Sequence, residues 1–276
     1  MQNMEIEIKP PSKWHFFDIK ELIYYKDTLY FLTWKDIKVK YKQAVLGFLW
    51  AFLQPIAMTA VFVLFNLAVN VSLGDVNIPY PLFVLSGIML WNLFANAITA
   101  TSNSVVNNSN ILKKIYFPRI FFPMSSLLVS LFDFFITLLI YIPVMIYYNV
   151  YPNWQIIYIL PVCILLVSIL VLGIGSFFGA LNVKYRDVKY IIPFVVQLLF
   201  FISPVFYSNN QIALPWVKTL YYLNPMTGII ELFRFGLFNT PINNLGLILS
   251  IIISLTFFVI GLFYFRKTEY FFADIS

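Results

Sequence analysis

Long apolar stretches separated by short polar segments dominate the chain. A helix needs roughly 20 mostly apolar residues to cross the hydrocarbon core of a bilayer. Six stretches suit such helices, and they cover residues 52–73, 80–100, 120–148, 155–183, 191–207 and 245–265. The third stretch is long enough to tilt or bend, whereas the fifth is short. The pattern predicts an all-α integral membrane protein with six transmembrane helices.

The segment 208–244, between the last two stretches, is neither a clean span nor a polar loop. Two short helices broken at Asn224-Pro225 fit its pattern best. Glu231 and Arg234 are spaced so that their side chains can pair on one helical face. Their apolar surroundings predict re-entrant half-helices on the outer side of the membrane. Such pieces are tolerated at membrane depth when they pack in protein or line a water-filled cavity.

Basic residues gather in alternate polar segments. Of the 18 Lys and Arg residues, 16 lie in the arm before the first span, the loops after the second and fourth spans, and the tail. Because basic residues collect on the cytoplasmic side, both termini are predicted to be cytoplasmic. Residues 1–43 then form a cytoplasmic arm, residues 44–265 the transmembrane domain and residues 266–276 a tail. The arm lacks the apolar core of a cleavable signal peptide.

Composition excludes a soluble protein and most kinds of site chemistry. Hydrophobic residues make up 61% and charged residues 11% of the chain, against a usual charged share of about 25%. The single cysteine, Cys163, excludes a disulfide framework, and the single histidine, His15, excludes a multi-histidine metal site. No P-loop, catalytic-serine or zinc-protease motif occurs, so the chain is predicted to bind no nucleotide, cofactor or metal ion itself. The net charge of +6 follows from the cytoplasmic lysines and needs no nucleic acid.

The arm ends in the pattern of an interfacial helix. Aromatic and apolar residues recur there at spacings of three and four, and lysines lie along one flank. The stripe and the flank comprise Tyr30, Trp34, Ile37, Tyr41, Lys35, Lys38 and Lys42. Asp36 and Lys40 are expected to pair on the opposite side. This combination is typical of a helix in the headgroup plane, and the alternative is an ordinary juxtamembrane linker.

The polar loop after the second span predicts a short cytoplasmic helix. Ser109 or Asn110 can cap it, and Pro118 disfavours its continuation. The loop is either a solvated connector or a docking element for a soluble partner. Under the second interpretation the coupling residues are Asn110, Ile111, Lys113 and Lys114.

One carboxylate, that of Asp133, lies in the middle of the third span. An intramembrane acid is costly and is by default a functional candidate; the alternative is a protonated or hydrogen-bonded packing residue. A proton-coupled secondary transporter that uses Asp133 is one possible function, although six spans without an evident inverted repeat argue against it. A membrane enzyme is disfavoured because no nucleophile and base are combined.

Four segments in order resemble the ABC-2 type permeases that export bacterial surface polysaccharides. The first runs from Trp34 to Trp50 and on to Pro55, with Lys40 and Ala44 where the family usually has Arg and a hydroxyl residue. The others are residues 112–119, residues 185–187 with 204–207, and Asn224-Pro225 with Phe233-Arg234. The resemblance covers residues 16–265 and is strongest to the O-antigen export permease of the Wzm type.

This resemblance implies a homodimer of permeases bound to two copies of a separate ATPase, which would hold ATP and magnesium. It implies an interface helix, a coupling helix between the second and third spans, and a channel for a lipid-linked glycan at the dimer interface. The segment 208–244 would then close the pathway as an outer gate built around Asn224, Pro225, Glu231 and Arg234. The chain would be a transport subunit of the bacterial inner membrane and not an enzyme. An exporter of teichoic acid, lipid or drug with the same architecture is the alternative.

Overall fold

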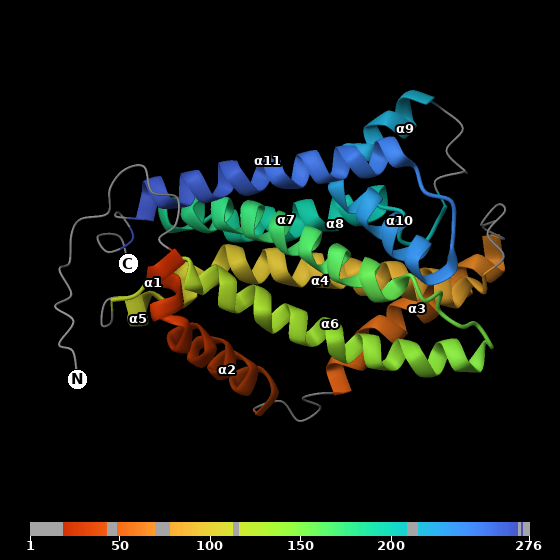
Figure 1. The fold of residues 1–276 in the computed structure, drawn as a ribbon, viewed down its shortest axis with the longest axis horizontal. Coiled ribbons are helices and arrows are strands. Elements are labelled where there is room, and N and C mark those ends of the chain that lie inside the picture. The colour runs from red at the N-terminus through yellow and green to blue at the C-terminus, as the bar shows by residue number, and fades with distance from the viewer. Residues whose placement is uncertain are drawn as a thin grey trace.

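The structure, a computed structural model, describes residues 19–42, 49–69, 78–112, 116–208, 215–269 and 272. Every long regular element in these ranges is a helix, which confirms the all-α prediction. In chain order the helices are α1 (Ile19–Tyr24), α2 (Lys26–Lys42), α3 (Trp50–Val69), α4 (Tyr80–Asn107), α5 (Ser109–Leu112), α6 (Phe121–Tyr147), α7 (Ile156–Lys184), α8 (Val188–Ile202), α9 (Pro215–Tyr222), α10 (Pro225–Phe238) and α11 (Asn244–Thr268), as drawn in Figure 1.

Five of these helices, α3, α4, α6, α7 and α11, are long and apolar enough to cross a membrane. They correspond to the first four predicted stretches and the sixth. The fifth stretch forms α8, whose 15 residues fall short of the roughly 20 that a bilayer core needs. Within the described ranges, the six-span prediction therefore holds for five helices of spanning length, and α8 is a shorter apolar helix.

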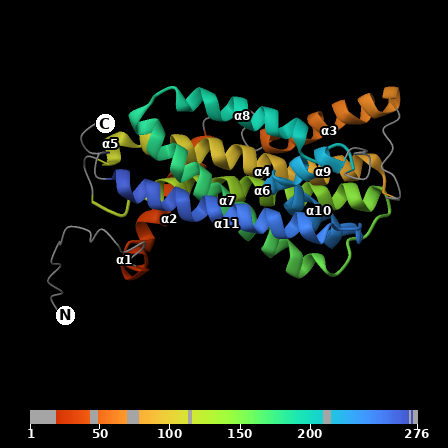
Figure 2. The ribbon, with the colours of Figure 1, turned by 90° about the horizontal axis from the view of Figure 1, so that it is seen from above.

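The long helices run side by side along the long axis of the molecule. Figures 1 and 2 show α4 among α6, α7 and α11, with α3 and α8 farther out. In both views α1, α5 and the C-terminal end of α11 lie at one end of the bundle, and α9 and α10 lie toward the other. The bundle therefore has two distinct ends, which are built from different parts of the chain.

The predicted short elements are present in the described part of the chain. α2 is the helix expected at the end of the arm, and α5 is the short helix expected after the second span. Lys113 and Lys114 lie outside the described residues. α9 and α10 are separated at the predicted break, where the Asn224 side chain accepts a hydrogen bond from the Met226 N–H and caps α10.

α4 continues to Asn107, whereas the second span was predicted to end at residue 100 and lead into a loop. The added residues are polar, yet their side chains hydrogen-bond carbonyl groups of their own helix. Ser102 Oγ donates to the Ile98 carbonyl at 2.5 Å, and Asn103 Nδ2 donates to the Thr99 carbonyl at 2.8 Å. These bonds satisfy the polar groups locally and allow the helix to continue, so the predicted helix end was wrong.

Buried apolar side chains form two clusters. The main one joins α4, α6, α7 and α10 and includes Phe94, Tyr141, Leu170 and Phe233. The smaller one lies at the end of the bundle that carries α1 and α5, and its residues come from distant parts of the sequence. It comprises Leu32, Val105, Phe117, Ile120, Phe121, Phe122, Ala180, Leu262, Phe265 and Phe272.

Glycines bring α7 and α11 close together. A Cβ atom added to Gly173 would lie 2.5 Å from the Phe258 nitrogen and 2.6 Å from the Phe257 carbonyl carbon. Gly261 of α11 approaches the Gly173 backbone in the same way. Small residues at such crossings let backbones of membrane helices pack directly against each other.

We expect Gly173→Ala to lower the thermal midpoint of the detergent-solubilised protein, because the added methyl group collides with the α11 backbone. Overpacking of this kind costs about 1–3 kcal/mol. Gly179→Ala, on the same helix, is the matched control, because its Cβ would meet its nearest neighbour at an ordinary 3.4 Å. Equal midpoints for the two variants would contradict the close α7–α11 contact.

Candidate functional site

Two rows of polar side chains, one on α4 and one on α6, line the same space. On α4 the row is Asn92, Asn96, Thr99, Asn103 and Asn107, at spacings of three and four that place them on one helical face. On α6 the row is Ser126, Ser130, Asp133 and Thr137, with the same spacing. Each row lies on a helix whose other positions are mostly apolar.

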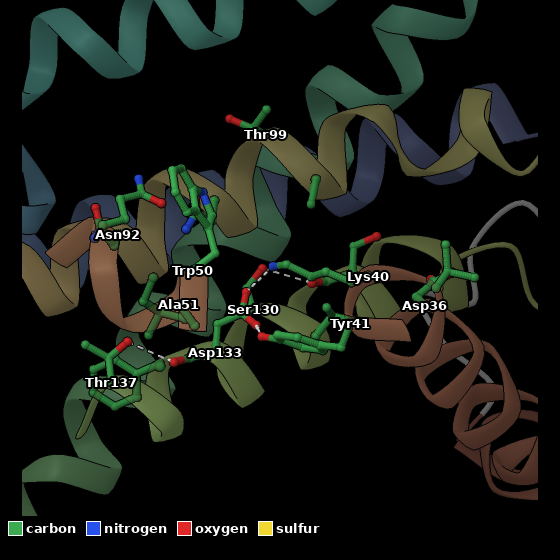
Figure 3. A pocket seen from close by; sticks show the side chains of 18 of the residues that line it. Asp36, Lys40, Tyr41, Trp50, Ala51, Asn92, Thr99, Ser130, Asp133 and Thr137 are labelled. Atoms are coloured by element: carbon green, nitrogen blue, oxygen red, sulfur yellow. Dashed lines mark hydrogen bonds and ion pairs between the residues drawn. The ribbon is translucent and has the colours of Figure 1, made fainter. Parts of the chain in front are cut away.

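The two rows line a cavity of about 1170 Å³, which we call the polar cavity. α3 contributes Trp50, Ala51 and Gln54 to its wall, and α2 contributes Lys35, Asp36, Lys40 and Tyr41. Figure 3 shows Asp133 and Ser130 of α6 pointing toward the side chains of Lys40 and Tyr41 on α2. The polar cavity is thus lined by three long helices and the helix expected at the membrane interface.

Most hydroxyl groups in the wall are already bonded to their own helix. Thr99 Oγ1 donates to the Ala95 carbonyl at 2.8 Å, and Ser130 Oγ donates to the Ser126 carbonyl at 3.1 Å. Thr137 Oγ1 donates to the Asp133 carbonyl at 3.0 Å. The amides of Asn92 and Asn96, by contrast, make no hydrogen bond to another residue in the described part of the chain.

Asp133 is held by two side chains of α2. The Lys40 ammonium and the Tyr41 hydroxyl both donate to its carboxylate. Burial and the neighbouring carboxylate raise the pKa of Tyr41 above its usual value, so this hydroxyl stays neutral and keeps its proton for the bond. The intramembrane acid therefore forms an ion pair across 93 residues of sequence.

The predicted pair of Asp36 with Lys40 is wrong. Lys40 turns to Asp133, and the Asp36 carboxylate instead accepts from Lys35 Nζ at 3.0 Å. Lys35 Nζ also donates to Asn108 Oδ1 at 3.0 Å, just beyond the end of α4. The packing of α2 on α6 therefore gives Lys40 a partner on another helix in place of its local i,i+4 partner.

Only the first part of the predicted aromatic stripe on α2, Tyr30 and Trp34, faces away from the bundle, whereas Tyr41 contacts α6. The rings of Tyr30 and Trp34 are stacked, and Lys38 Nζ lies 5.4 Å from the centre of the Trp34 ring. All three side chains are exposed, as is that of Lys42. Leu32, on the opposite side of the helix, is the buried residue of α2. α2 therefore presents an aromatic and basic surface outward while its other side meets the polar cavity.

The two predicted coupling residues that the structure describes, Asn110 and Ile111 of α5, lie at the opposite end of the molecule from α9 and α10. Asn110 is exposed, and Ile111 packs against the smaller apolar cluster. The Arg119 guanidinium in the following loop lies over the Phe272 ring and donates to the Glu269 carbonyl. The loop after α5 is therefore joined to the C-terminal segment of the chain.

Among the predicted gate residues, Arg234 is buried and makes four hydrogen bonds. Its guanidinium donates to the carbonyls of Pro204 at 2.6 Å and Val205 at 2.8 Å, just after α8. It also donates to the Phe83 carbonyl at 3.0 Å and to Ser86 Oγ at 3.2 Å on α4. Arg234 thus ties α10 to α4 and to the end of α8. Pairing between Glu231 and Arg234 stays a prediction.

Sequence reasoning missed the amide row of α4. The signal was available, because Asn or Thr recurs every three or four residues from 92 to 107. Most residues of the same stretch are apolar, so its mean hydropathy is high and conceals its one polar face. Asp133 was predicted as a candidate, but its partners Lys40 and Tyr41 were not. They lie 93 and 92 residues away in the sequence, and no local pattern indicates that α2 packs on α6.

Comparison with known proteins identifies relatives over most of the chain. Residues 28–238 match the family described as ABC-2 type transporter. An O-antigen export system permease protein RfbA of Klebsiella pneumoniae is 29% identical over 259 residues, which cover 91% of this chain and 96% of the relative. The RfbA protein of Myxococcus xanthus is 28% identical, covering 78% and 82%. The polysialic acid transport protein KpsM of Escherichia coli is 23% identical, covering 76% and 80%.

We expect Lys40→Gln and Asp133→Asn to lower stability non-additively, because each removes the same ion pair. Lys40 is half-exposed, so the interaction is worth about 1 kcal/mol or less. The thermal midpoints of the single and double variants in detergent measure it, and the double variant should lose no more than the worse single one.

Lys38→Gln is the matched control for that cycle, because the Lys38 ammonium lies over Trp34 and makes no bond to Asp133. Its effect should add to that of Asp133→Asn. Additive losses for Lys40→Gln and Asp133→Asn would contradict the ion pair.

Proposed function

Because this chain belongs to the ABC-2 type transporter family, we propose that it is the membrane subunit of an ABC transporter that exports a lipid-linked, O-antigen-like polysaccharide across the bacterial inner membrane. The observation that carries the proposal is the polar cavity. In a chain with five helices long and apolar enough to span a membrane, two rows of polar side chains line one large space, as a pathway for a polar cargo requires. The printed functions of the relatives, O-antigen export and polysialic acid transport, supply the class of cargo.

The energy would come from ATP and magnesium held by two copies of a separate ATPase subunit. The sequence has no P-loop, which supports a separate source of energy. α5 and the loop after it are the proposed docking element, with Asn110, Ile111, Lys113 and Lys114 as coupling residues. Ile111 and the C-terminal Phe272 share the smaller apolar cluster, so a movement at α5 would reach both α2 and α11.

The finer architecture of the proposal has six crossings and two cytoplasmic termini. α8 would complete the sixth crossing together with the residues that follow it. α1, α5 and the end of α11 share one end of the bundle, and that end carries most of the described basic residues, which supports its assignment to the cytoplasm. Two such subunits would assemble as a homodimer. The proposed domains are the arm 1–43, the transmembrane domain 44–265 and the tail 266–276.

The opposite end would form the outer gate. α9 and α10 are short helices broken at Asn224-Pro225, which suits a hinge between two re-entrant pieces. Arg234 would anchor the second piece, since its four hydrogen bonds bind α10 to α4 and to the end of α8. Glu231 and Pro225 belong to the same proposed gate.

The membrane-surface role proposed for α2 rests on its outward face. Trp34, Lys38 and Lys42 are exposed there, and an aromatic and basic surface suits the headgroup region. The inward residues Lys35 and Tyr41 would connect this surface helix to the polar cavity. Asp133 would serve as an anchor for α2 and not as a proton carrier, because the proposed energy source is ATP.

The test is export in cells that make such a glycan but lack their own permease and ATPase. Expressing this chain with its partner ATPase should bring the glycan to the cell surface. Expressing either subunit alone, or an ATPase whose Walker A lysine is replaced, should leave the glycan inside. Surface glycan that appears without the ATPase would contradict the proposal.

We expect a cysteine at Asn110 to form a crosslink with the partner ATPase, because Asn110 is exposed on the proposed docking helix. A bifunctional maleimide applied to membranes containing both subunits measures it. Thr240→Cys, between α10 and α11 at the other end of the bundle, is the matched control and should give no such product. A crosslink at Thr240 alone would show that the end of the bundle carrying α9 and α10 faces the ATPase, opposite to the proposed membrane orientation. An intact complex with no crosslink at Asn110 would refute the docking assignment.

A further inference from the structure

We propose that the polar cavity is a binding site for neutral sugar units of the exported glycan, which the amides of Gln54, Asn92 and Asn96 bind. The inference rests on the function proposed above and assigns the cargo a position within it. The residues that line the polar cavity come from α2, α3, α4 and α6 of one chain, so the proposed site needs no residue of a second subunit.

The first argument is the amides' free hydrogen-bonding capacity. Asn92 and Asn96 are one turn apart on α4, and Gln54 faces the same space from α3. None of the three side chains bonds another residue in the described ranges. A primary amide both donates and accepts, as a sugar hydroxyl does, so the three amides suit a ligand that is rich in hydroxyl groups.

The second argument is the distribution of charge. The described charges that face the polar cavity are paired with one another, Lys40 with Asp133 and Lys35 with Asp36. They lie on the side of α2 and α6. The wall formed by α3 and α4 offers amides, hydroxyls and apolar atoms. A charged ligand would have to break an existing ion pair to be neutralised, whereas a neutral ligand leaves both pairs in place.

The third argument is shape. The volume of about 1170 Å³ exceeds the range of roughly 300–1,000 Å³ that holds a drug-sized ligand, so more than one sugar ring fits. Trp50 lies one turn before Gln54 on α3, and its half-exposed ring also lines the polar cavity. An aromatic ring gives the C–H face of a pyranose an apolar surface, while the amides bind the hydroxyl groups at its edge.

The test uses the complex of this chain with its ATPase in nanodiscs, without ATP. The only native cysteine of this chain, Cys163, is fully buried, so Asn96→Cys gives this subunit a single accessible thiol, whose labelling is read on the permease band alone. A water-soluble maleimide should label it, and saturating glycan released from its lipid carrier should slow labelling at least fivefold. Asn244→Cys, exposed at the start of α11, is the control and should label at an unchanged rate.

A second variant tests the amides directly. Asn92→Leu, combined with Asn96→Cys, should raise the glycan concentration for half-protection two- to tenfold, because one neutral hydrogen bond is lost. The same substitution outside the cavity, Asn244→Leu, should leave that concentration unchanged. Equal values for the two would show that the Asn92 amide does not bind the glycan.

Three results would overturn the inference. They are an Asn96→Cys thiol that never labels, labelling that released glycan does not slow, and equal protection by a polyprenyl phosphate that carries no sugar. None of these readouts needs ATP hydrolysis. If one of these three results is found while the unaltered complex still displays glycan at the cell surface, the binding site is refuted and the proposed function is supported. If no glycan reaches the cell surface but glycan still slows maleimide labelling, the export proposal is refuted and the binding site is supported.

Discussion

The absence of water in the bilayer core is the constraint on which the rest of this structure depends. Every polar group at membrane depth must bond within the protein or face a water-filled space. α4 meets this constraint in two ways. Its hydroxyl groups, such as those of Thr99 and Ser102, return to carbonyls of their own helix. Its amides at positions 92 and 96 face the polar cavity, while Phe94 and Ala97 fill the core on the other side.

The same constraint explains why the two ends of the bundle are built differently. Toward the end carrying α9 and α10, the buried Arg234 donates to the carbonyls of Pro204 and Val205, which follow the end of α8. At the other end, a cluster with several aromatic rings joins α2, the loop after α5 and Phe272. Between them, α2 is held over the polar cavity by the polar contacts of Lys35, Lys40 and Tyr41. α2 is therefore held by an apolar contact at Leu32 and by polar contacts in its second half.

Much of the fold could be predicted from the sequence, because span length and helix breaks are local properties. Five predicted spans, the short helix α5 and the break at Asn224 all follow from apolar runs, caps and prolines. The extension of α4 to Asn107 was missed because its polar side chains are satisfied by contacts that composition does not reveal. The Lys40–Asp133 pair was missed for a related reason: i,i+4 spacing suggested Asp36, and only the packing of α2 on α6 brings the true partner close. The polar cavity needs four helices to be placed together, so no single stretch of sequence displays it.

The central claim is that one face of α4 lines a water-filled cavity inside an apolar bundle. The most direct measurement is the accessibility of spin labels along α4 in nanodiscs to a water-soluble paramagnetic chelate, compared with accessibility to oxygen. Labels should be placed singly at Asn92, Asn96, Thr99 and Asn103 on the cavity face, and at Leu90, Phe94, Ala97 and Thr101 on the buried face. The account predicts that chelate accessibility rises and falls with the helical period and is high on the cavity face. Uniformly low chelate accessibility along α4, or accessibility without that period, would contradict it.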